Sequence, residues 1–253
     1  LTAFLVAWLI AALVEGVSLW IAAIYLARRH MLEQPLLGAI ADARREHEGL
    51  GRFMVTANAD IMLGDLTGRL TPLIVGAMLG PAAAGLYSIA HRATIVISQP
   101  AQMLGQAAYA ELARLAAGKG AGPLVRHALG RCIAIALATA LPLLVILACF
   151  SREIAVLIGG QDFAGAADVM IWLTLARVVA LCGPPTSAAL IAIGRPGLSV
   201  TANLVAGLGL MPLLPLFTRF GGLAGAGYHA LLQSVTAASL LGFALWRSTG
   251  RAS

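Results

Sequence analysis

The chain has 253 residues, of which 60% are hydrophobic and 11% charged, with 17 Lys and Arg against 11 Asp and Glu. An ordinary soluble domain is about 45–50% apolar and about 25% charged. This chain is therefore too apolar to cover its own surface in water, which excludes a soluble enzyme and a disordered protein. Its basic residues lie at the ends of apolar runs, as in membrane proteins, and form no aromatic-interleaved patch for nucleic acid.

Seven apolar runs are long enough to cross a bilayer. A hydrocarbon core of about 30 Å needs about 20 apolar residues per helix, and Gly or Pro pairs mark the turns between the runs. The sequence therefore predicts an all-α, polytopic membrane protein with about seven transmembrane helices. The runs cover residues 3–26, 53–79, 83–110, 128–150, 165–193, 197–217 and 223–245.

The basic residues outside these runs predict the orientation of the chain. Twelve of them fall on one side of the predicted membrane, against Arg152 and Arg219 on the other. Because cytoplasmic loops carry the excess of Lys and Arg, we expect residues 27–52 and the C-terminal tail to be cytoplasmic. The chain opens at Leu1 inside an apolar run, and we expect it to lack an N-terminal part.

Ionisable residues in the first two runs are candidates for a function inside the membrane, where charge is costly. Asn58, Asp65 and Arg69 fall at i, i+7 and i+11 and so share one helix face, whereas Asp60 points to roughly the opposite face. Asp65 and Arg69 are spaced for an ion pair. The alternative is a cavity lining in which a carboxylate couples transport to a cation. Glu15 in the first run is either neutral and hydrogen-bonded or faces the cavity.

The third run carries a polar stripe along an otherwise apolar helix. Such a helix either lines a water-filled cavity or uses its polar groups to hold neighbouring helices, and the number of polar groups favours the cavity. Pro100 is expected to bend this helix, and Pro142, Pro184-Pro185, Pro212 and Pro215 mark further kinked or broken helices. The stripe consists of Tyr87, Ser88, His91, Arg92, Ser98, Gln99, Gln102, Gln106 and Tyr109.

Arginine inside a cavity of low dielectric can hold a phosphate or diphosphate through two hydrogen bonds. Arg92 is the first candidate for this role, and Arg177 in the fifth run is the second. Motifs for catalysis are absent from the sequence, since it has no HExxH, Walker or GxSxG pattern. Its three cysteines have no CxxC spacing. We therefore expect no metal, no cofactor and no enzymatic activity.

Several stretches resemble polysaccharide flippases of the multidrug/oligosaccharidyl-lipid/polysaccharide exporter superfamily. Residues 76–90 (GAMLGPAAAGLYSIA) resemble the "G..lG...aGlY..A" stretch of that family. Weaker similarities follow in the family's order at residues 109–115 (YAELARL), 158–163 (IGGQDF), 189–195 (ALIAIGR) and 220–226 (FGGLAGA). Many members carry an acidic residue shortly before the first stretch. Here the nearest are Asp60 and Asp65, so a coupling role is not carried over to either.

The resemblance implies one half of a two-bundle flippase in the bacterial inner membrane. Residues 1–26 would be the last helix of the N-terminal bundle, 27–52 a cytoplasmic loop, 53–245 a six-helix bundle and 246–253 a cytoplasmic tail. The implied cargo is an undecaprenyl-pyrophosphate-linked oligosaccharide, the repeat unit of an O-antigen, capsule or exopolysaccharide. Its phosphates would bind Arg92, Arg69 and Arg177. Its sugars would meet His91, Gln99 and Gln102, with Ser88, Gln106 and Asn58 completing the lining.

Three alternatives stay open. A lipid II flippase of the same superfamily also handles a diphosphate lipid. A drug/cation antiporter would need carboxylates in its cavity, which the arginines disfavour. A non-catalytic membrane subunit of a glycan-assembly complex belongs to another class, and an assembly enzyme would need a large outer loop, whereas the longest here is about 151–164. The expected partners are the lipid-linked glycan, membrane lipids and a glycan polymerase or export complex, with no nucleic acid.

Overall fold

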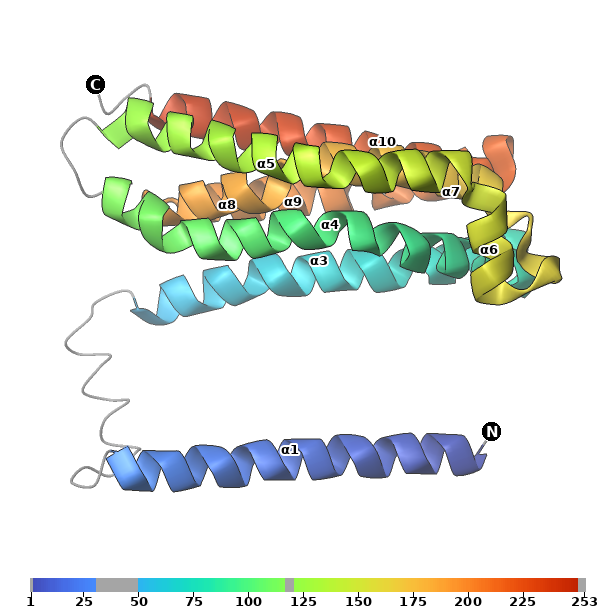
Figure 1. Cartoon of the computed structure of the whole chain (residues 1–253), viewed down its shortest axis with the longest axis horizontal. Coiled ribbons are helices and arrows are strands. Elements are labelled where there is room, and N and C mark those ends of the chain that lie inside the picture. Colours follow the sequence, from blue (N-terminus) through green and yellow to red (C-terminus); the bar gives the residue numbers. More distant parts are fainter. Residues whose placement is uncertain (1, 31–49, 117–120, 250–253) are drawn as a thin grey trace. The chain divides into compact units, whose positions relative to one another are not determined.

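The computed structural model describes residues 2–30, 50–116 and 121–249, and the elements in these ranges are helices (Figure 1). Contacts divide the chain into two units, Leu1–Arg52 and Phe53–Ser253. The first unit contains α1 (Thr2–His30), whose large apolar side chains, such as Leu13 and Trp20, are exposed. The second unit is a helical bundle.

The bundle is built from helices that run back and forth along one axis (Figure 1). Gly80, with φ of +92°, ends α3, and Pro81 begins α4, because glycine tolerates this backbone and proline favours the first helical position. The elements are α3 (Leu50–Leu79), α4 (Pro81–Ala116), α5 (Ala121–Cys149), α6 (Ser151–Gly159), η1 (Gln161–Phe163), α7 (Ala166–Ala180), α8 (Gly183–Ala192), α9 (Pro196–Leu204), η2 (Val205–Gly209), η3 (Met211–Leu213) and α10 (Leu214–Thr249).

Four segments of the described chain are long and apolar enough to cross a membrane: Leu9–Leu26, Pro123–Cys149, Ala166–Ala192 and Pro196–Ser248. The last has 53 residues. A straight helix of that length would extend about 80 Å, more than twice a hydrocarbon core of about 30 Å. It folds back at Gly222, which has φ of +55° and ψ of −138° inside α10.

These findings confirm the prediction of an all-α, multi-pass membrane protein. The predicted count of seven spans is not confirmed, because α3 and α4 are not among the four segments. Both helices carry charged and amide side chains in their middle, for example Asp65 in α3 and Gln102 in α4, and these lower their mean hydropathy.

The two ends of the bundle differ in charge. The end of α4, the start of α5, the turn between α8 and α9 and the end of α10 lie together (Figure 1). The described basic residues of this end are Arg114, Arg126, Arg131, Arg195 and Arg247. The opposite end, with α6 and the Gly222 turn, carries Arg152 and Arg219. We call these the basic end and the α6 end.

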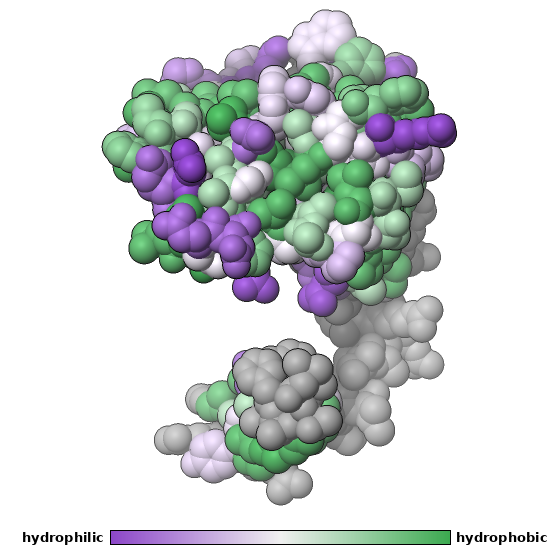
Figure 2. All heavy atoms as spheres, turned by 90° about the vertical axis from the view of Figure 1, so that its right-hand side faces the viewer, coloured by the Kyte–Doolittle hydropathy of each residue, from purple (hydrophilic) through white to green (hydrophobic). Residues whose placement is uncertain are grey.

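Large apolar side chains are exposed on the outside of the bundle, as lipid contact requires. Leu141 on α5 is 62% exposed, and at the α6 end Leu157 and Phe220 are more than 80% exposed. Figure 2 looks onto the α6 end, where apolar side chains alternate with patches of polar ones. Such a surface suits the boundary between acyl chains and headgroups better than water.

Two clusters of buried side chains hold the bundle together. One surrounds Ile97, Met170 and Leu214, and the other surrounds Leu112 and Leu190. α7 lies between α4 and α10, and α4 also contacts α5 and α8. Small residues allow these helices to approach closely, as is usual in membranes.

Replacing Gly227 by Ala is expected to destabilise the bundle. The added methyl would lie 2.5 Å from Trp172 Cβ, and overpacking of this kind costs about 1–3 kcal/mol. The matched control is Gly242→Ala in the same helix, where the methyl would meet no atom within 4 Å. Thermal unfolding in detergent, followed by tryptophan fluorescence, tests this. Equal melting temperatures for the two variants would contradict the close packing of α7 on α10.

Candidate functional site

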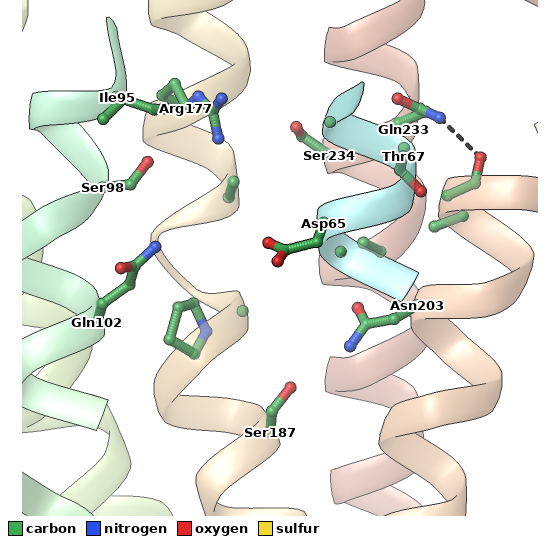
Figure 3. Close-up of a pocket in the computed structure, with 18 of the residues that line it drawn as sticks. Asp65, Thr67, Ile95, Ser98, Gln102, Arg177, Ser187, Asn203, Gln233 and Ser234 are labelled. Atoms are coloured by element: carbon green, nitrogen blue, oxygen red, sulfur yellow. Dashed lines mark hydrogen bonds between the residues drawn. The ribbon is translucent and has the colours of Figure 1, made fainter. Parts of the chain in front are cut away.

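A cavity of about 1030 Å³ lies inside the bundle, between α3, α4, α7, α8, α9 and α10. Pockets for small ligands usually measure about 300–1,000 Å³, so this one has room for a ligand at the upper end of that range. Figure 3 shows its lining, with polar side chains on every wall.

The α4 wall is formed by the polar stripe of the third predicted span. His91, Arg92, Ser98, Gln99 and Gln102 line the cavity from this helix. The opposite face of α4 carries Ala93, Ile97 and Ala101, which are buried in the protein core. The 3.6-residue periodicity of the sequence therefore directs the polar residues to the cavity and the apolar ones to the core.

Arg177 reaches the α4 wall from α7. Its Nη2 donates toward the ring of His91, at 3.2 Å from Nδ1 and 3.3 Å from Nε2. Tyr87 is buried, and its ring stacks on that of His91 with centroids 6.0 Å apart. An imidazole nitrogen accepts a hydrogen bond only while it carries no proton. The contact therefore places a cationic guanidinium beside an uncharged acceptor, so its positive charge is not neutralised there.

The α3 wall contributes Asp65, Thr67 and Arg69. Figure 3 shows Asp65 pointing into the space between α3 and α8. Thr67 marks a close approach of α3 to η2, because a Cβ on Gly207 would lie 2.9 Å from Thr67 Oγ1. A side chain at position 207 would therefore require the Thr67 side chain to move.

The far wall contains a broken helix that two side chains of α10 stabilise. Between α9 and α10 the chain passes through the π-helix η2 and the 3-10 turn η3, which leave backbone carbonyls without helical partners. Gln233 Nε2 donates to Gly207 O at 2.8 Å, and His229 Nε2 donates to Leu210 O at 2.9 Å. An irregular backbone inside a membrane is stable when protein groups satisfy it in this way.

The cavity is cationic. Its described lining holds Arg69, Arg92 and Arg177 against one carboxylate, Asp65. The described part of the chain contains one salt bridge, between Arg114 and Glu111 at 2.7 Å, and it lies outside the cavity. Asp65 and Arg69 therefore do not pair with each other, although their spacing permits it. Three arginines remain available to an anion.

The structure brings together most of the residues that the sequence suggested. Arg69, Arg92, Arg177, His91, Gln99, Gln102 and Asp65 line the same cavity.

Five residues of the sequence prediction are not placed in this lining. Ser88, Gln106 and Asn58 lie outside it. Close to Gln106 the wall is tightly packed, because a Cβ added at Gly105 would lie 3.2 Å from the backbone of Pro184, a lining residue. Glu15 belongs to α1 in the first unit. The side chain of Asp60 lies outside the described residues.

Sequence reasoning missed part of the lining. Ser187, Asn203, Gln233 and Ser234 lie on α8, α9 and α10 and face the cavity. Each interrupts an apolar run, and His229 and Gln233 are spaced i,i+4. This spacing is the signal that could have identified a polar face on the last helix.

Comparison with known proteins assigns a family. The model of a family described as polysaccharide biosynthesis protein matches residues 1–168. No curated protein and no solved structure matches the chain significantly. The match covers both units, including α1 and the α3 and α4 walls of the cavity. This multi-pass membrane protein therefore belongs to the polysaccharide biosynthesis protein family.

Proposed function

We propose that the protein moves a lipid-linked oligosaccharide across the bacterial inner membrane. The observation that carries this proposal is the cavity in the bundle, with three arginines and a set of amide and hydroxyl side chains. A diphosphate needs cationic donors, and sugars need neutral groups that both donate and accept. An undecaprenyl-pyrophosphate-linked repeat unit of an O-antigen, capsule or exopolysaccharide presents both.

In this proposal the glycan head enters the cavity while the lipid tail stays in the bilayer. Arg69, Arg92 and Arg177 bind the diphosphate, because a guanidinium offers two parallel hydrogen bonds to phosphate oxygens. The cavity then opens to the other side by rocking of helices. The broken segment at η2 and η3 is of the kind that transporters use at their binding sites.

The positive charge of the cavity lining favours this proposal over the antiporter alternative. A cationic cargo would be repelled by three arginines facing one carboxylate. Asp65 is the candidate for coupling to a cation, since it is the one carboxylate in the described lining. A lipid II flippase would use the same diphosphate chemistry, and the cargo tested in cells distinguishes the two. Membrane lipids and a glycan polymerase or export complex are the proposed partners.

Replacing Arg92 by Ala is expected to reduce glycan export about tenfold or more, because a hydrogen bond to a charged group contributes about 1.5–3 kcal/mol. The protein is expressed from its complete gene in a bacterium whose O-antigen flippase is deleted, and surface glycan is measured. The matched control is Arg152→Ala, an exposed arginine of the α6 end outside the cavity. Its loss increases the charge bias and so preserves the orientation.

Full export by Arg92→Ala, with normal protein levels, would contradict the role of Arg92 in phosphate binding. Failure of the unchanged protein to restore surface glycan would exclude that cargo, and the same assay is then repeated in cells depleted of their lipid II flippase.

The basic end of the bundle is expected to be cytoplasmic, since cytoplasmic loops carry the excess of Lys and Arg. A green fluorescent protein fused after residue 253 should therefore fluoresce, and alkaline phosphatase fused there should be inactive. The control is a phosphatase fusion after Gly160, at the α6 end, which should be active. An active phosphatase at the C-terminus would reverse the proposed orientation.

A further inference from the structure

The polar residues of the cavity are spread along the helix axes. Arg92 and Gln102 both line the cavity and are ten residues apart on α4, which corresponds to about 15 Å at 1.5 Å per residue. Arg177 and Ser187 are also ten residues apart, on α7 and α8, which run in the same direction as α4 (Figure 1). The cavity is therefore an elongated space rather than a single shell around one point.

The three arginines share one level of this space. Arg177 contacts His91, the neighbour of Arg92. On α3, a Cβ at Gly76 would lie 3.1 Å from Ala84 Cβ of α4. Because α3 and α4 are antiparallel, residues that are seven positions from this contact on each helix lie at the same level. These residues are Arg69 on α3 and His91 on α4. We call the level of Arg69, Arg92 and Arg177 the cationic end.

The other end of the cavity is neutral. Figure 3 shows Gln102, Ser187 and Asn203 away from Arg177. Asp65 lies at about the height of the Gln102 amide, between Arg177 and the other two residues. No charged residue of the described lining lies beyond Asp65 in this direction. Amide and hydroxyl groups both donate and accept hydrogen bonds, so they match sugar hydroxyls. We call Gln102, Ser187 and Asn203 the neutral end.

We infer that the cavity recognises its cargo at two subsites, with the diphosphate at the cationic end and a sugar of the glycan at the neutral end. This inference rests on the proposed function. Asp65 separates the subsites, because its carboxylate repels phosphate in a low-dielectric space and accepts hydrogen bonds from sugar hydroxyls. It thereby confines the diphosphate to the cationic end.

The separation of the subsites defines the class of cargo. A length of about 15 Å along α4 is more than a single pyranose ring covers. The neutral end therefore contacts a sugar beyond the one that carries the diphosphate. The cargo is an oligosaccharide rather than one sugar, and Gln102 is a residue that determines specificity.

The test compares equilibrium binding of three radiolabelled lipids to the purified protein expressed from its complete gene. The lipids are undecaprenyl diphosphate, the same lipid with one N-acetylglucosamine, and the same lipid with three. The unchanged protein should bind the trisaccharide lipid most tightly. In Gln102→Leu this lipid should lose about two- to tenfold in affinity, the range of one neutral hydrogen bond, while undecaprenyl diphosphate binds as before.

Two controls make the result specific. Gln106→Leu changes the same residue type one turn further along α4, outside the cavity lining, and should bind all three lipids like the unchanged protein. Arg92→Ala should weaken binding of all three by a similar factor, about tenfold or more, because each contains the diphosphate.

The possible failures are distinguishable. If the unchanged protein binds none of the three lipids more tightly than phosphatidylglycerol, the proposed function is wrong. If it binds the diphosphate lipids but does not prefer the trisaccharide, the inference of two subsites is wrong. The same conclusion follows if Gln102→Leu keeps the full preference.

Discussion

The structure depends on one constraint, which is that charged and polar groups inside a membrane must meet water, a partner or a ligand. Three arginines, from α3, α4 and α7, meet this constraint by lining one cavity. Burying them in the apolar clusters would cost several kcal/mol per charge. The helices are therefore arranged with their apolar faces in the two core clusters or on the outside, and with their polar faces on a shared inner space.

The same constraint explains the far wall of the cavity. A π-helix followed by a 3-10 turn frees backbone carbonyls that lipid cannot satisfy. Gln233 and His229 donate to two of them, at Gly207 and Leu210. Because the carbonyl of Gly207 can only accept, Gln233 must present its amide nitrogen to it. The break in the helix and the two polar residues of α10 are thus one structural feature, although the bonded residues are 19 and 26 positions apart in the chain.

Much of this arrangement could be predicted from the sequence, and the rest could not for physical reasons. Apolar runs predicted the helices, and the polar stripe on α4 predicted a cavity face, because both signals are local. Proline predicted the breaks near Pro184 and Pro212, but α5 continues through Pro142. The position of Gln106 outside the cavity depends on how α4 packs against α8, and the role of Gln233 depends on η2. Both depend on contacts between segments far apart in the chain, and such contacts cannot be predicted from residue spacing.

The pairing of α10 with the broken helix also has a consequence for how the chain is inserted into the membrane. The segment Pro196–Ser248 contains Arg219 and Arg247 as its charged residues, close to the Gly222 turn and to its own end. If the part of this segment before Gly222 entered lipid alone, the carbonyls of Gly207 and Leu210 would lack their donors. If the part after Gly222 entered alone, Gln233 and His229 would lack their acceptors. Donors and acceptors are therefore divided between the two parts of the segment, and we expect the two parts to enter the membrane together as a helical hairpin.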